Sequence, residues 1–441
     1  MGSPDLRSIA NLKTPHPFPS STKNLSSVAH FGLIMRHHTK TIAFIQWSMV
    51  VLYLFLLLAP FIFPDPAETP FSWKDLQLLS VFIFWGFGWP LIILSTMIFG
   101  RIWCGIFCPD GTLTETISHH GQKRSIPRWI RWPGWPYLTL LSYTIAFCLS
   151  NATYNHLGTS ILLGSLTLAC ALTGFLYGNG RRIWCMYLCP SNSIFIYLAK
   201  LSFFHFRVDP KKWDAYKNPV EPIHCAPLIN IKQMKSASAC HACGRCSSHR
   251  DAVELAIRAP DREILSDVSK QTHTVEALTL FFGLTGICTA AFLFTKYPFI
   301  YFYATENAVH TPLLFMFALV SGTGILLGLF FWGMTWLSYK TISHATVSWQ
   351  QLSLGMIPLA GTGFFLGLTT STLSFFQPAA WVMQSILLSQ LALLAVAFLF
   401  SFWLGWRLLI REKNIRNVMA MIIYGTALGI LGIIWAIQLW A

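Results

Sequence analysis

The chain contains one stretch that joins a membrane span to a pair of cysteines: residues 77–109 read QLLSVFIFWGFGWPLIILSTMIFGRIWCGIFCP. Residues 77–99 carry no charge, and about 20 such residues suffice to cross roughly 30 Å of hydrocarbon. Arg101 and the pair Cys104 and Cys108 follow directly. The stretch therefore predicts a transmembrane helix that is followed by two thiols.

The whole chain has the composition of a membrane protein. Of its 441 residues, 54% are hydrophobic and only 11% are charged. A soluble protein of this length needs more charge to cover its surface. The 18 Trp and 35 Phe suit helices that are anchored at a bilayer interface. We therefore expect lipid to be the main solvent of the chain.

Nine apolar stretches are long enough to span a bilayer, and they predict an all-α polytopic membrane protein with about nine transmembrane helices. The third stretch is the weakest, because Asn151 interrupts it and Pro136 bounds it. The stretches are 42–63, 77–99, 136–153, 157–178, 275–295, 311–336, 350–370, 382–407 and 417–438.

The basic residues predict which side of the membrane each loop faces. With the N-terminus inside, every Lys and Arg lies on the inner side except Lys74 and Lys296. This asymmetry is the positive-inside pattern, and it accounts for the net charge of +14 without a nucleic acid as partner. Nine spans would then place the N-terminus in the cytoplasm and the C-terminus in the periplasm.

The cysteine pair is repeated further along the chain. Residues 100–109 read GRIWCGIFCP, and residues 180–190 read GRRIWCMYLCP, with Cys185 and Cys189 in the second copy. Each copy follows a hairpin of two expected spans, so the repeat is parallel and its pseudo-twofold axis runs along the membrane normal. Such an axis would bring the two pairs together beneath the bilayer.

The spacing of each pair indicates its chemistry. Cysteines four residues apart on a helical turn share one face, with Cβ atoms about 5–6 Å apart. The Pro after each pair marks a helix end with free N–H groups, and these groups, like the preceding Arg, favour thiolate over thiol. Two such pairs make a four-thiolate cage for a [4Fe–4S] cluster, zinc or Cu(I). Packing alone accounts poorly for the duplication, and a disulfide is not expected on the reducing side.

Residues 207–272 form the one long polar stretch, expected as a small cytoplasmic ferredoxin-like insert. It contains Cys240-His241-Ala242-Cys243-Gly244-Arg245-Cys246. This C-x2-C-x2-C spacing is the ferredoxin pattern, in which a tight loop holds three corners of a cubane. Gly244 allows the positive φ that such a loop often needs. Zinc is the plainer alternative for this loop.

The fourth ligand of the insert is not set by spacing, because Arg250 occupies the position where ferredoxins place their next cysteine. Cys225 is the preferred candidate and His249 the alternative. With Cys225, the other cysteines Cys148, Cys170 and Cys288 are left inside spans as lipid-facing or packing residues. The eight expected cofactor and metal ligands are then Cys104, Cys108, Cys185, Cys189, Cys225, Cys240, Cys243 and Cys246.

Four regions follow from these features. Residues 1–41 are a cytoplasmic N-terminal tail, 42–206 a four-helix membrane domain with both repeats, 207–272 the insert, and 273–441 a five-helix C-terminal membrane domain. The last region has no cysteine-rich, glycine-rich or charged constellation within its spans. It could dock a partner, bind a quinone or form a transport path.

The paired Trp-Cys-x-x-x-Cys-Pro motifs, followed by the ferredoxin-like loop, resemble the polyferredoxin-type membrane iron–sulfur proteins (NapH-, NosR- and CcoG/RdxA-like). The resemblance covers about residues 40–255. It implies [4Fe–4S] binding, with Cys104, Cys108, Cys185 and Cys189 matching the membrane-surface motifs. It also implies a multi-pass protein of the bacterial inner membrane.

The leading hypothesis is electron transfer through two [4Fe–4S] clusters, between a cytoplasmic or quinol donor and a respiratory or membrane partner. The alternatives are a copper reductase or assembly factor for a respiratory enzyme, and a redox sensor. No acid–base pair, nucleophile or phosphate loop supports a hydrolase or transferase, so an oxidoreductase component is expected. A quinone or flavin stays open as a further group, since about 30 Å of hydrocarbon separates the inner thiolates from the outer face.

Overall fold

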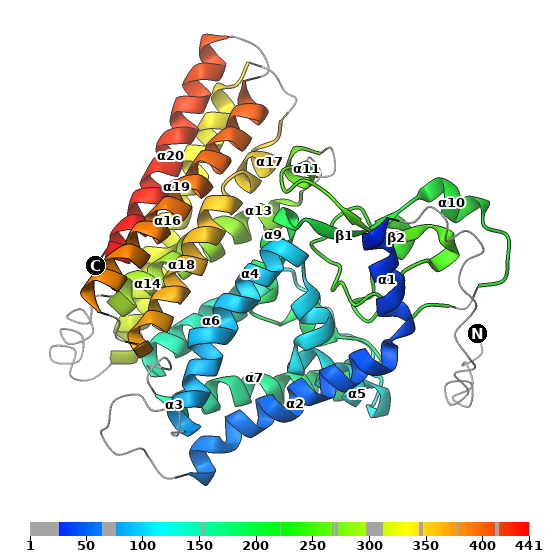
Figure 1. Ribbon diagram of the computed structural model, residues 1–441. Helices are drawn as coiled ribbons and strands as arrows, with labels where there is room; N and C mark the ends of the chain where they lie inside the picture. Colours follow the sequence, from blue (N-terminus) through cyan, green and yellow to red (C-terminus); the bar gives the residue numbers. More distant parts are fainter. Residues whose placement is uncertain are drawn as a thin grey trace.

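The computed structural model describes residues 26–63, 76–150, 152, 155–220, 222–266, 269, 272–296, 312–343, 347–376, 379–410 and 414–440. Within these ranges the chain is mostly helical (Figure 1). Eight helical segments are long and apolar enough to cross a membrane. The protein is therefore a polytopic all-α membrane protein, as its composition predicts.

The eight segments correspond to eight of the nine expected spans. Three of them are continuous helices assembled from shorter pieces, in two cases through a π-helical turn. In chain order the segments are α2 (Thr39–Ile62); α3 (Leu76–Val81) with η3 (Phe82–Gly88) and α4 (Trp89–Phe99); α7 (His156–Tyr177); α13 (Thr274–Thr279) with η8 (Leu280–Cys288) and α14 (Thr289–Lys296); α16 (Pro312–Thr341); α17 (Trp349–Leu354) with α18 (Ile357–Phe376); α19 (Ala380–Leu409); and α20 (Ile415–Trp440).

The ninth expected span, 136–153, is the helix α6 (Trp135–Ser150), whose 16 residues make it shorter than the other eight segments. The chain before α6 lies at the C-terminal end of α7, where the backbone N–H of Arg124 donates to the carbonyl of Leu176. Beyond its last turn, the carbonyl of Ala152 accepts from the Thr159 hydroxyl at the start of α7. The helix therefore carries the chain from one end of α7 to the other, although at 1.5 Å per residue it is only about 24 Å long.

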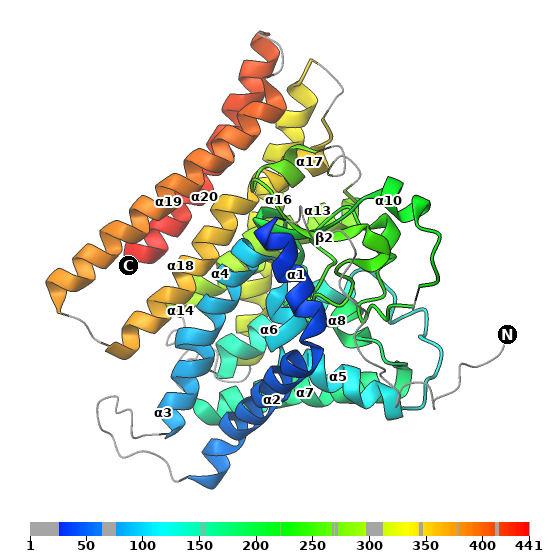
Figure 2. The same ribbon diagram turned by 45° about the vertical axis from the view of Figure 1, so that its right-hand side comes forward.

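The C-terminal half forms one bundle. Helices α16, α18, α19 and α20 run side by side in both views (Figures 1 and 2), and α16 packs along η8. Trp435 of α20 is fully buried at the centre of this bundle, against Gly363 and Gly367 of α18. Small residues let helix backbones approach closely, which drives association in lipid. This bundle has the largest buried apolar core among the described residues.

The polar insert is a loop structure closed by a two-stranded antiparallel sheet. Strand β1 (Phe204–Val208) enters it and β2 (Val253–Ile257) leaves it, with Phe206 opposite Leu255. Short helical turns lie between the two strands: α10 (Pro210–Ala215), η6 (Ile231–Gln233) and η7 (His249–Asp251). Another, α11 (Arg262–Leu265), follows β2. The sheet brings the two ends of the insert together beside the membrane helices.

A helix precedes the first span and lies over the insert. Helix α1 (Ser27–His37) starts at Ser26, whose Oγ accepts from the backbone N–H of Ala29 at 3.2 Å. It packs on β2, and Arg36 donates to the carbonyl of Ser247 at 2.7 Å. The expected N-terminal tail thus includes a helix that is docked on the cysteine-rich loop.

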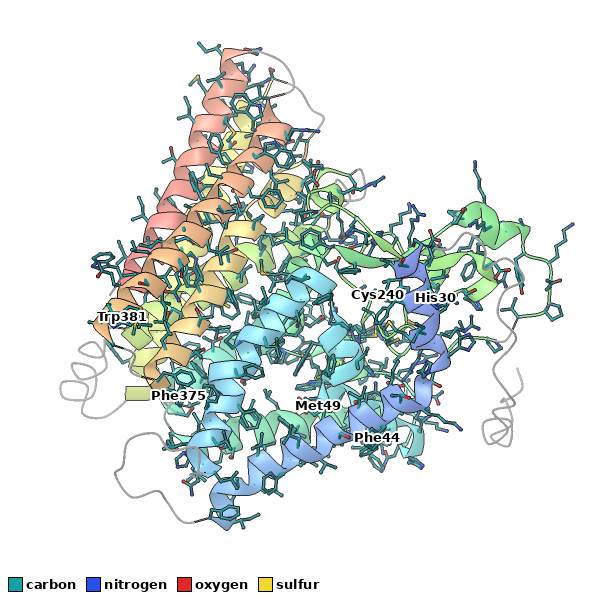
Figure 3. The ribbon with its side chains drawn as sticks, in the orientation of Figure 1. His30, Phe44, Met49, Cys240, Phe375 and Trp381 are labelled. Atoms are coloured by element: carbon teal, nitrogen blue, oxygen red, sulfur yellow. The ribbon has the colours of Figure 1, made fainter. Side chains whose placement is uncertain are left out.

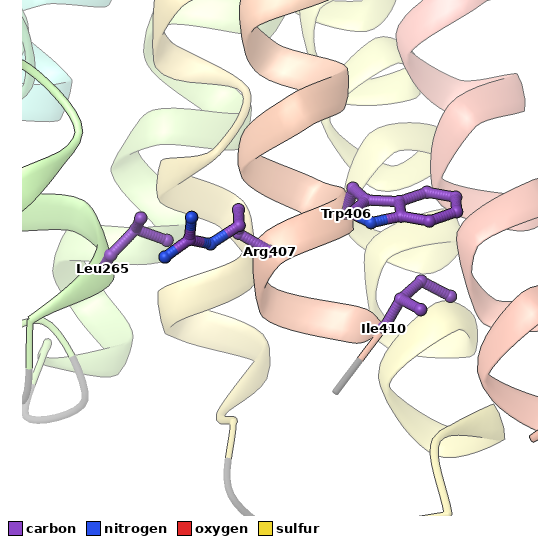
Figure 4. A pocket seen from close by; sticks show the side chains of 4 residues that line it. All are labelled: Leu265, Trp406, Arg407 and Ile410. Carbon is purple, nitrogen blue, oxygen red and sulfur yellow. The ribbon is translucent and has the colours of Figure 1, made fainter. Parts of the chain in front are cut away.

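The segment after β2 also contacts the C-terminal bundle, at the end of the bundle where α19 finishes. Leu265 of α11 lines a hollow of about 400 Å³ together with Trp406, Arg407 and Ile410 at the end of α19 (Figure 4). The junction between α19 and α20 therefore lies on the same side of the molecule as the insert.

Candidate metal centre

The first membrane pair lies where two helices meet. Cys104 sits in η4 (Trp103–Phe107), a π-helical turn, and Cys108 is the N-cap of α5 (Pro109–His120). The sulfur of Cys108 accepts from the backbone N–H of Gly111 at 3.4 Å. Pro109 begins α5 rather than interrupting it, because the first turn of a helix needs no donor from that residue. The prediction of a helix end with free N–H groups at this Pro is confirmed.

The second pair has a related geometry. Cys185 lies in α8 (Ile183–Tyr187), and Cys189 follows that helix just before α9 (Asn192–Leu198). In each copy, the backbone N–H of the second cysteine is bonded to the carbonyl of the Trp before the first, as in Cys108 to Trp103 and Cys189 to Trp184. The expected α-helical face for both sulfurs is therefore replaced by a wider i→i+5 turn.

The fold brings the two pairs together. We call two groups electrostatic neighbours when they lie close enough for the charge of one to affect the ionisation of the other. In this sense the thiol of Cys185 is a neighbour of Cys104 and Cys189, and the thiol of Cys108 is a neighbour of Cys104 and Cys185. This group, called the membrane site below, consists of Cys104, Cys108, Cys185 and Cys189.

The membrane site is recessed between helices. The amide of Gln46 in α2 donates to the carbonyl of Gly105 at 2.9 Å, and the thiol of Cys170 in α7 donates to the carbonyl of Asp110 at 3.2 Å. Gln46 lies seven residues after the start of α2 at Thr39, and Cys170 lies seven residues before the end of α7 at Tyr177, or about 10 Å in each case at 1.5 Å per residue. The two pairs, which the repeat was expected to bring together, meet beside these two helix ends.

The insert gathers a second group of four cysteines. Cys246 has Cys225, Cys240 and Cys243 as electrostatic neighbours, and Cys240 also neighbours Cys225. The side view with sticks shows Cys240 on the insert, beside α1 with His30 and close to a set of sulfur atoms (Figure 3). This group, called the insert site, consists of Cys225, Cys240, Cys243 and Cys246.

The backbone of the cysteine loop turns through two residues of positive φ. Gly244 has φ of 77°, as expected, and Ala242 also adopts a positive φ of 49°. The backbone N–H of Ala242 points to the sulfur of Cys240 at 3.4 Å. Amide donors aimed at cysteine sulfur are among the features that tune iron–sulfur sites.

His249, the alternative fourth ligand, is differently placed. Its ring packs edge-on against Trp213 at 5.2 Å between centroids, and burial together with the nearby Arg36 and Arg250 lowers its pKa. The structure brings Cys225 into the neighbourhood of the other three thiols, while the buried Nδ1 of His249 has no hydrogen-bond partner among the described residues.

The two sites adjoin each other. A Cβ added to Gly105 would overlap the carbonyl oxygen of His241 and lie 3.1 Å from the backbone nitrogen of Cys243. Only Gly fits this close backbone approach. Since Gly105 lies between two membrane-site cysteines and His241 between two insert-site cysteines, the two loops are in direct contact.

Several buried donors around the two sites have no partner among the described residues. They are Nε of Arg101, the hydroxyl of Tyr143 and Nδ1 of His241. Tyr143 is an electrostatic neighbour of Cys189, and Arg101 lies 3.9 Å from the sulfur of Cys104. Buried donors rarely lack acceptors, so these groups fit an anionic sulfur-rich group at this place.

Burial also affects the acidity of the insert thiols. It raises the pKa of Cys240 to about 12 and raises the pKa of Cys225. Metal ligation requires thiolates, and a bound cation ionises them. These thiols would therefore be ionised by the metal that they bind.

Within the described ranges, no three His, Cys, Asp or Glu side chains lie close enough to hold a single metal ion. A single zinc needs all of its sulfurs about 2.3 Å from one point, whereas in a cubane each cysteine binds a different iron.

Sequence reasoning missed several residues at the sites. Cys170 was expected to be a lipid-facing or packing cysteine, and it packs in a buried core with Cys185, next to the membrane site. Asp110 accepts from the Thr167 hydroxyl at 2.8 Å beside the membrane site. The position of Asp110 directly after Cys108-Pro109 was the one feature of the sequence that could have indicated its role. Nothing local could have indicated Glu115, because its partners Arg182 and Arg245 are distant in sequence.

Comparison with known proteins supports the cysteine chemistry. A family model described as "4Fe-4S binding domain" matches residues 81–127 and 158–209, which contain the two membrane pairs. A protein of Escherichia coli (strain K12) described as "Putative electron transport protein YccM" is 27% identical over 187 residues, covering 35% of this chain and 50% of that protein. The chain thus matches about half the length of this curated relative. No solved structure matches.

Proposed function

Because this chain carries a 4Fe–4S binding domain of the polyferredoxin type in a polytopic membrane protein, we propose that it relays electrons through two [4Fe–4S] clusters. The membrane site, Cys104, Cys108, Cys185 and Cys189, would hold one cluster. The insert site, Cys225, Cys240, Cys243 and Cys246, would hold the other. Bound clusters supply one-electron redox chemistry at both places.

The observation that carries the proposal is the contact between the two sites at Gly105. Electron transfer between centres needs a short path through protein, and here the cysteine loops touch without an intervening side chain on Gly105. The insert site lies in the polar insert under helix α1, and the membrane site contacts α2 and α7. This arrangement suits entry of electrons at one site and their exit from the other.

The direction and the partners belong to the same proposal. The N-terminus, the insert and both cluster sites would lie in the cytoplasm or at the cytoplasmic edge of a bacterial inner membrane, and the C-terminus in the periplasm. The donor would be a cytoplasmic redox protein or a quinol, and the acceptor a respiratory or membrane partner. The C-terminal bundle, whose described residues bring no cysteine group to the sites, would serve to dock that partner.

The test is anaerobic purification in detergent, with iron, copper, zinc and acid-labile sulfide counted per chain. We expect about eight iron and eight sulfide, because two cubanes hold four of each. Electron paramagnetic resonance (EPR) after reduction should show two cluster signals. Replacing Cys243 with Ser should remove the insert signal and keep the membrane signal.

Other metal contents would contradict the relay. Copper without sulfide would favour the alternative function, a copper reductase or assembly factor for a respiratory enzyme, since soft thiolates also select Cu(I). Zinc without sulfide would make the sites structural. A cluster that reduces and reoxidises repeatedly with a low-potential donor would speak against a labile sensor.

A further inference from the structure

The two membrane repeats share an arginine three residues before their first cysteine. These residues, Arg101 and Arg182, are 4% and 2% exposed. Arg181, the extra residue of the second repeat, is exposed instead. Burying a guanidinium is costly unless it is paired and hydrogen-bonded, so the partners of the two buried arginines indicate their role.

Arg101 spans both cluster sites. It lies 3.9 Å from the sulfur of Cys104 in the membrane site. It also donates to the carbonyl of Ser238 at 2.8 Å, two residues before the first cysteine of the insert loop. Its charge is an electrostatic neighbour of Cys185 on one side and Cys240 on the other.

Arg182 makes the same connection by a longer route. It donates to the carbonyl of Cys104 and pairs with Glu115 of α5 at 2.8 Å. The second oxygen of Glu115 accepts from Arg245 at 2.5 Å, and Arg245 lies between Cys243 and Cys246 in the insert loop. One carboxylate therefore bridges an arginine of the membrane repeat and an arginine of the insert loop.

We infer that Arg101, Arg182, Glu115 and Arg245 are positioning residues that hold the two cluster sites at one fixed separation. The inference rests on the proposed function, since the separation matters only if both sites hold clusters. Both halves thus carry a buried arginine at the same position: Arg101 contacts the insert directly, and Arg182 is connected to it through Glu115. The planar guanidinium suits this task, because it binds two acceptors in a fixed geometry.

The simpler role, stabilising thiolates within the membrane site alone, does not account for these contacts. It would require neither the bond from Arg101 to Ser238 nor the ion pair between Glu115 and Arg245. Both contacts reach out of the membrane site into the insert. Their removal should therefore alter the relation between the clusters before it alters the clusters themselves.

The experiment compares Arg245→Gln and Glu115→Gln with Arg181→Gln as the matched control. Each protein is purified anaerobically, its iron is counted, and the EPR spectrum of the fully reduced form is recorded for magnetic interaction between clusters. We expect all three variants to keep about eight iron, as two cubanes require. The interaction should weaken in Arg245→Gln, weaken further in Glu115→Gln because that carboxylate pairs with both arginines, and stay unchanged in Arg181→Gln.

A conservative variant separates positioning from general damage. Arg245→Lys keeps a donor and a charge within reach of Glu115, so it should restore most of the interaction. If Glu115→Gln does not fold, Arg245→Gln decides alone, because its side chain is one-third exposed and Glu115 keeps Arg182 as partner.

The outcomes distinguish this inference from the proposed function. Eight iron in the variants with an interaction equal to that of Arg181→Gln would contradict the positioning role and leave the relay intact. Two clusters without any magnetic interaction in the unaltered protein would do the same. An unaltered protein without iron and sulfide would overturn both proposals together.

Discussion

At the scale of single residues, the insert site depends on a cysteine that lies outside its own loop. Cys225 is 15 residues before Cys240 in the chain, yet all four thiols of the insert site are mutual electrostatic neighbours. The carbonyl of Ala226, the next residue, accepts from the backbone N–H of Arg182. The membrane repeat thus helps to hold Cys225 in place.

This placement predicts unequal effects of two substitutions. Cys225→Ser should remove the insert cluster or make it labile, because a serine oxygen is a poor replacement for a soft thiolate. His249→Ala should leave the cluster in place, because its ring packs on Trp213 instead. The measurement is iron content with EPR of the reduced protein. The opposite pattern, in which only His249→Ala loses the signal, would assign the ligand to His249.

At the scale of an element, helix α1 covers the insert site. Its 11 residues are too few for an isolated helix to be stable in water, where about 12–15 are marginal. Met35 is buried in the core that surrounds the cysteine loop, next to Phe206 and Leu255. Burial of one such side chain contributes about 1.5–3 kcal/mol. The helix therefore depends on the insert, and the insert depends on the helix for its cover.

Gly32 offers a test of this cover. A Cβ at Gly32 would lie 2.9 Å from the hydroxyl of Ser247 and 3.0 Å from Cβ of Leu255. Gly32→Val should displace α1 and make the insert cluster bleach several-fold faster in air, while the recessed membrane cluster bleaches at its usual rate. The loss of visible absorbance with time measures both.

The matched control is Phe31→Val, since Phe31 is the neighbouring residue on the exposed side of α1. It introduces the same side chain without a contact to the loop. If the two variants bleach at the same rate, α1 has no protective role.

At the scale of the whole molecule, two contacts decide the membrane topology that we expect. Helix α6 passes from one end of α7 to the other, and the junction of α19 and α20 lies beside Leu265 of the insert. The last helix then leaves from the side of the insert and ends on the other side. We expect α6 to cross despite its 16 residues, which with the eight candidate spans gives nine crossings.

Reporters fused to the chain would test this topology. A reporter placed within residues 121–134 should be cytoplasmic, and one placed after α20 should be periplasmic. Alkaline phosphatase and a fluorescent protein are a suitable pair, since each is active on one side only. A cytoplasmic reporter after α20 would mean that one of the nine helices does not cross.

The sequence by itself determined the membrane class, eight candidate membrane spans and the 4Fe–4S binding of the region that holds the two cysteine pairs. These follow from local properties: the length of apolar runs such as 77–99, and the repeated spacing of Cys104 with Cys108 and of Cys185 with Cys189. Such patterns involve neighbouring residues, and the physics of lipid and of metal ligation acts on them directly. The 4Fe–4S assignment of the membrane pairs was predicted in this way and is supported by the family match.

Only the tertiary structure decided how the parts meet. The position of the membrane site beside α2 and α7 and the docking of α1 both depend on contacts between distant parts of the chain. So does the bridge from Arg182 through Glu115 to Arg245, whose two ion pairs join residues that are 67 and 130 positions apart. No local pattern encodes such pairs, because a buried charge is satisfied by whichever partner the fold brings within reach. Cys170 packs in a buried core, as expected, but only the folding of α5 against α7 places it beside Asp110.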